Sequence, residues 1–228
     1  MVKMKMMRDK NGKMKYPVFL QALVLTIVVM LIGMYIGMSM EQNRLVKVND
    51  YFVESEVMLL DVMAHDNMIS SLGVSCDELE KSNINLLNDI YSQAILLEEY
   101  EKSGKITDTI KVLHKKYDAL RSYMWINSIK IKEKCGSDFD TIVYLYNYDE
   151  KELTKKAEQN VWSKVLYEIK QEKGDSVVLI PMAVDTNLKS LDILLKEYSV
   201  DTYPSVLINE DIVFDRLVDK EDILAVLN

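Results

Sequence analysis

The chain has 228 residues and a formal net charge of −8, from 28 basic and 36 acidic side chains. Residues 1–16 hold six of the basic side chains and one of the acids, which leaves a net charge of −13 on the remainder. Nucleic acid and anionic lipid headgroups are therefore disfavoured as partners of residues 41–228, because both are already negatively charged.

An uncharged apolar segment, residues 17–39, follows the basic start directly. About 23 helical residues are enough to cross a bilayer core of ~30 Å. Because Lys- and Arg-rich flanks stay in the cytoplasm, we expect a cytoplasmic tail (1–16), a single-pass signal-anchor in the cell membrane (17–39) and an extracytoplasmic remainder. A cleaved signal peptide is the alternative, but the apolar run exceeds the usual ~7–15 residues and no A-x-A-like site closes it.

Two glycines in this segment, Gly33 and Gly37, form one G-x-x-x-G pair. Such a pair lets two membrane helices approach closely, which suggests a homodimer. Glycine is also common in membrane helices that do not dimerise, so the sequence leaves both alternatives open.

Residues 41–135 contain no proline and only two glycines, Gly73 and Gly104, each within two residues of a serine. This composition predicts an extracytoplasmic helical region that is broken at those two turns. Apolar residues in its first part recur at helical steps: Leu45, Val48, Phe52, Leu59, Val62 and Met63. After Gly104 the spacing is 3-4-3-4, as in a coiled coil: Ile110, Leu113, Tyr117, Leu120 and Met124. A short turn between two long helices favours an antiparallel hairpin.

The two cysteines lie almost symmetrically about the turn of this hairpin. Cys76 comes 28 residues before Gly104, and Cys135 comes 31 residues after it. Arms of nearly equal length bring both thiols to the open end, and thiols that are close outside the cytoplasm usually oxidise. We therefore predict a Cys76–Cys135 disulfide; two free thiols in a reducing compartment are the alternative.

Residues 138–228 alternate short β-branched runs with helical segments. The predicted strands are 141–146, 177–184, 206–208 and 212–217, and the predicted helices are 150–173, 188–198 and 220–227. The order β-α-β-α-β-β-α indicates a mixed sheet with helices on both faces. Pro181 inside the second strand predicts an edge position or a bulge.

Within this order, the segment VDTYPSVLI at residues 200–208 resembles the thioredoxin superfamily. The expected fold class is thus an α/β thioredoxin-like C-terminal domain, preceded by a transmembrane helix and an α-helical hairpin. The resemblance implies a cis Tyr203–Pro204 bond. It also implies that Thr202, Tyr203 and Pro204 bind an extended peptide by strand addition. Alternatively, Pro204 only shapes the turn and Tyr203 only packs.

The chain departs from the redox members of that superfamily, which place C-x-x-C at the start of the helix after the first strand. The matching positions, 148–152, read YDEKE, and residues 136–228 contain no cysteine. Thiol–disulfide exchange needs a thiolate nucleophile. No catalytic residue is therefore carried over, and we do not expect an enzyme.

The leading functional prediction is a membrane-anchored, redox-inactive module that binds an unidentified protein partner, or acts as a scaffold, outside the cytoplasm. One alternative is an oxidoreductase or folding factor that uses Cys76 and Cys135 as an exchangeable pair. Another is a docking subunit of a larger membrane complex. No cofactor is expected. No metal site is expected either, because His65 and His114 are the only histidines and no matching acid–cysteine cluster accompanies them.

Overall fold

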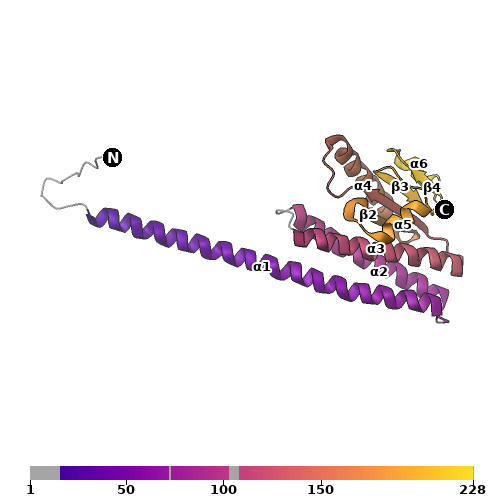
Figure 1. Ribbon diagram of the computed structural model, residues 1–228, viewed down its shortest axis with the longest axis horizontal. Helices are drawn as coiled ribbons and strands as arrows, with labels where there is room; N and C mark the ends of the chain where they lie inside the picture. Colours follow the sequence, from indigo (N-terminus) through magenta and orange to yellow (C-terminus); the bar gives the residue numbers. More distant parts are fainter. Residues whose placement is uncertain (1–15, 72, 103–107, 228) are drawn as a thin grey trace. The chain divides into compact units, whose positions relative to one another are not determined.

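The computed structural model describes residues 16–71, 73–102 and 108–227 (Figure 1). The predicted basic tail therefore lies outside the described residues, except for Tyr16. The chain forms two compact units, Met1–Asp50 and Tyr51–Asn228.

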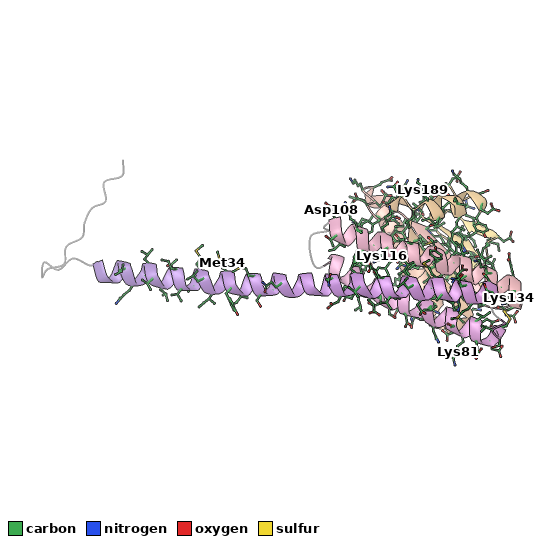
Figure 2. All side chains as sticks on the ribbon, turned by 60° about the horizontal axis from the view of Figure 1, so that its bottom comes forward. Met34, Lys81, Asp108, Lys116, Lys134 and Lys189 are labelled. Carbon is green, nitrogen blue, oxygen red and sulfur yellow. A yellow bond between two sulfur atoms is a disulfide. The ribbon has the colours of Figure 1, made fainter. Side chains whose placement is uncertain are left out.

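The first unit contains the predicted apolar helix. Helix α1 (Tyr16–Ser71) includes Leu20–Met40, 21 residues that are long and apolar enough to cross a membrane by length and composition. The side chains of Leu20–Met40 are solvent-exposed in the isolated chain; Met34, labelled in Figure 2, is 52% exposed. The homodimer through Gly33 and Gly37 stays a prediction.

The second unit begins with the end of α1, followed by α2 (Cys76–Lys102) and α3 (Asp108–Cys135). The Ser75 hydroxyl accepts a hydrogen bond from the Glu78 N–H at 3.4 Å, so the N-terminus of α2 is capped. At the end of α3, Gly136 has φ +65°, a conformation that favours glycine, and its N–H donates to the Lys132 carbonyl at 2.8 Å. At both ends, backbone groups that the helix leaves unpaired are satisfied by residues within one turn.

A mixed four-stranded sheet follows, with the order β2-β1-β3-β4. Its strands are β1 (Asp140–Tyr146), β2 (Val177–Ala183), β3 (Ser205–Ile208) and β4 (Ile212–Phe214). Strand β1 runs parallel to β2 and antiparallel to β3, and β3 is antiparallel to β4. The connecting helices are α4 (Leu153–Lys173), α5 (Lys189–Glu197) and α6 (Lys220–Leu224), with 3₁₀ turns η1 (Gly174–Ser176) and η2 (Val184–Thr186). Pro181 lies on the edge strand β2, where a missing N–H is tolerated.

Helices cover both faces of this sheet. One core joins Ile142, Tyr144 and Val206 to α4 and α6, with Trp162 fully buried. The other core joins Val143, Leu145 and Leu207 to α5 and to the α1–α3 helices, with Trp125 fully buried. The helical hairpin therefore packs directly on the sheet, with α3 against β2 and α5 (Figure 1).

The structure corrects several predicted ends. Helix α4 begins at Leu153 rather than Glu150, because the Glu150 carboxylate accepts hydrogen bonds from the Asn147 amide at 3.0 Å and the Glu152 N–H at 2.9 Å, which hold a turn. The last strand ends at Phe214 and the last helix at Leu224, both three residues earlier than predicted.

The buried face of α1 also differs from the prediction. It consists of residues at steps of three and four: Ser55, Met58, Val62, His65 and Ile69. Of the predicted residues, Val62 is buried, Phe52 and Leu59 are half-buried, and Met63 is 41% exposed. The side chains of Leu45 and Val48 lie outside those that the structure describes. The pattern was obscured because two of the buried positions, Ser55 and His65, are polar.

Candidate functional site

A cavity of about 390 Å³ lies within the second unit. It is bordered by α2, α3, β1, the loop after β1, α4 and Pro181 of β2. Five tyrosines line it: Tyr91, Tyr117, Tyr144, Tyr146 and Tyr148. Its size falls in the range of sites for small organic molecules, about 300–1,000 Å³.

One face of α3 supplies three ionisable side chains of the cavity region. His114, Asp118 and Arg121 recur at steps of four and three, so they share that face. Asp118 is fully buried; Arg121 Nη1 donates to its Oδ1 at 3.1 Å, and His114 Nε2 lies 3.6 Å from its Oδ2. Burial raises the pKa of the Asp118 carboxyl, while His114 and Arg121 oppose that change.

The last residue of β1 and the loop that follows it bring two tyrosines onto His114. Tyr146 Oη lies 3.3 Å from His114 Nε2, and the Tyr148 ring centroid lies 4.1 Å from the imidazole centroid. The Asp185 carboxylate after β2 accepts the N–H groups of Tyr148 at 2.8 Å and Asp149 at 2.9 Å. These bonds fix the loop at the carboxyl ends of the two parallel strands.

Helix α4 forms the opposite wall and is bonded to the sheet. Tyr144 Oη donates to the Gln159 carbonyl at 2.9 Å, and the Gln159 side chain donates to the Asn147 carbonyl at 3.2 Å. Burial raises the pKa of the Tyr144 hydroxyl, so it stays protonated and keeps donating.

The predicted peptide-binding residues lie elsewhere on the same unit. The Tyr203–Pro204 bond is cis, as the resemblance implied. Pro204 is buried, Tyr203 is half-buried with its hydroxyl donating to the Val200 carbonyl at 3.2 Å, and Thr202 is exposed. All three are described, and none of them is among the residues that line the cavity. Peptide binding at Thr202, Tyr203 and Pro204 stays a prediction.

The predicted disulfide is present. Cys76 and Cys135 are joined with an S–S distance of 2.05 Å and a Cα–Cα distance of 5.6 Å. They are the first residue of α2 and the last residue of α3, so the bond closes the open end of the hairpin. Since the chain has two cysteines, none remains for the sheet.

A second apolar surface lies on the exposed side of α1, which we call the α1 seam: Val53, Val57, Leu60, Ala64 and Met68. Leu60 is 68% exposed. The acidic residues Glu54 and Asp61 lie beside the seam, and Glu56 accepts a hydrogen bond at 3.0 Å from Lys116 of α3, labelled in Figure 2. This seam was not predicted, although its 4-3-4-4 spacing of apolar residues is visible in the sequence.

The sequence analysis also missed the cavity, because its residues come from five different elements. His114 was considered only as a metal ligand. Over the residues that the structure describes, no group of three or more His, Cys, Asp or Glu side chains could hold a metal ion.

No family model and no curated protein matches this chain.

Proposed function

We propose that this chain is a single-pass membrane protein whose folded unit stands outside the cytoplasm as a redox-inactive, thioredoxin-like module for protein interaction. The Cys76–Cys135 disulfide carries the proposal. Disulfides persist in oxidising compartments, which favours an extracytoplasmic location. The same bond uses both thiols of the chain and joins two helix ends, which favours a structural role over exchange.

The anchor and its orientation rest on two features of the chain. Leu20–Met40 is long and apolar enough to span a bilayer. The excess of positive charge in residues 1–16 favours a cytoplasmic N-terminus and an outer C-terminus.

The thioredoxin-like assignment is supported by the topology of the sheet. The strands have the order β2-β1-β3-β4 with β3 antiparallel to β1, helices lie on both faces, and Pro204 directly precedes β3. At the position of the redox motif this chain has Tyr148 and Asp149, whose N–H groups are bonded to Asp185. A binding role is therefore favoured over thiol chemistry.

The α1 seam supports a protein partner. Exposed apolar side chains that follow one helix face mark interaction surfaces when they are contiguous. The 4-3-4-4 spacing suits an amphipathic helix of the partner. The seam lies on the opposite side of α1 from the buried face, so it remains accessible when the second unit is folded.

Thiol labelling in intact cells tests the proposal. A membrane-impermeant maleimide should label the wild-type chain only after an impermeant reductant has opened the disulfide. Labelling only after lysis would contradict the orientation. Labelling without reductant would contradict the structural disulfide.

The alternative oxidoreductase would show disulfide-reductase turnover that disappears in Cys76→Ser and Cys135→Ser. We expect no turnover in the wild-type chain.

A further inference from the structure

Two deeply buried side chains of the cavity have hydrogen-bonding capacity that the described residues leave unused. Tyr117 is 1% exposed, and its Oη has no hydrogen-bond partner in the described part of the chain. Arg121 is 6% exposed, and of its five N–H groups the described contacts pair one, with Asp118. Leaving a buried donor such as the Tyr117 hydroxyl unpaired is costly, so native proteins usually supply a partner.

Both groups are donors at neutral pH and lie on one helix face. Burial raises the pKa of Tyr117 to about 12, so the hydroxyl keeps its proton. Arginine is always protonated and matches planar carboxylates with its fork of N–H groups. Tyr117 and Arg121 are four residues apart on α3, so they are neighbours on the helix surface.

The walls around these donors are aromatic. Tyr144 and Tyr146 stack with centroids 5.3 Å apart, and Tyr148 packs on His114. Such walls favour a flat apolar body. Two charged lining residues, Lys156 and Glu98, are exposed, and their opposite charges offset each other. Arg121 is buried, so its positive charge lies inside the cavity. Asp118 pairs with Arg121 through Oδ1 and Nη1 only, so the described contacts leave the other N–H groups of the guanidinium available to a second carboxylate.

We propose that this cavity binds a small aromatic carboxylate, with its ring between the tyrosines and its carboxylate on Arg121 and Tyr117. The volume of about 390 Å³ suits a free molecule of one or two rings. None of the residues that line this site belongs to the α1 seam or to residues 202–204. It goes beyond the proposed protein-interaction role and does not depend on it.

Ligand-observed ¹⁹F NMR on the full-length protein in lipid nanodiscs tests the proposal. The probe is 4-fluorophenylacetate, and the matched neutral probe is 4-fluorophenylacetamide. We expect the ¹⁹F signal of the carboxylate probe to relax faster with protein-loaded nanodiscs than with empty ones. We also expect this probe to bind more tightly than the amide. Tyr117→Phe keeps the ring and removes the donor, so it should weaken carboxylate binding about tenfold, as for one hydrogen bond to a charged group.

A space-filling variant separates cavity binding from surface binding. Ser163→Trp places an indole at the cavity wall and should abolish binding, whereas Lys189→Trp, at an exposed position of α5, should leave it unchanged. Circular dichroism verifies that each variant is folded. Equal binding of acid and amide, no binding beyond empty nanodiscs, or full binding by Ser163→Trp would each overturn the proposal. The proposed function is tested separately, by thiol labelling in intact cells. If that labelling shows the expected orientation and disulfide, the proposed function stands even when the ligand experiment fails.

Discussion

His65 is a polar residue on the buried face of α1, where it is 5% exposed. Burial lowers the pKa of its imidazole below 6.5, partly opposed by Asp61, the Leu79 backbone and Asp66. The folded state therefore binds fewer protons than the unfolded state, so the free energy of unfolding falls as the pH drops through 6.5. The slope is at most about 1.4 kcal/mol per pH unit for this one proton.

His65→Leu should therefore flatten the pH dependence of the unfolding free energy between pH 7.5 and 5.5, measured by denaturant titration of the full chain. Ser55→Ala, on the same buried face of α1, keeps His65 and serves as the control, which should retain the His65 contribution. If the unfolding free energy of His65→Leu changes with pH as steeply as that of the wild-type chain, the buried imidazole of His65 does not contribute to the pH dependence.

At the scale of the element, α1 presents two apolar faces, and among the described residues only one of them packs against other elements. Leu60→Glu in the α1 seam should change the free energy of unfolding by less than about 0.5 kcal/mol, because the side chain is exposed. We expect the same substitution to remove cross-linking to a partner that co-purifies in fixed stoichiometry. Ile193→Glu on α5, equally exposed at 68%, is the matched control and should retain cross-linking. Loss of cross-linking in both variants would contradict the prediction that the partner binds specifically at the α1 seam.

The elements also show what the sequence can predict. Helix ends such as Ser75 and Gly136 were predictable because their hydrogen-bond requirements are met by residues within one turn. The disulfide was predictable because the hairpin arms have nearly equal length. The cavity was not, because Tyr91, Arg121 and Tyr146 meet only after α2, α3 and the sheet have packed. The inner face of α1 was obscured by the buried polar residues Ser55 and His65.

At the scale of the whole molecule, the helical region and the sheet share one core. Trp125, Leu120 and Met124 of α3 are fully buried in a cluster that also contains sheet residues. Fully burying one such side chain is worth about 1.5–3 kcal/mol. Removing the sheet would expose several of them together, and the disulfide at the helix ends cannot replace that burial.

We therefore expect that a chain ending at Gly136, still membrane-anchored and disulfide-bonded, loses the cooperative unfolding transition of the full chain and becomes sensitive to limited proteolysis within α2 and α3. Circular dichroism during denaturant titration measures the first effect, and mass spectrometry of the fragments locates the second. A cooperative transition at the midpoint of the full chain would mean that the hairpin folds as an independent stalk. Loss of that transition would mean that the hairpin and the sheet fold as one unit, so a partner bound at the α1 seam would be held by the whole unit rather than by a separate stalk.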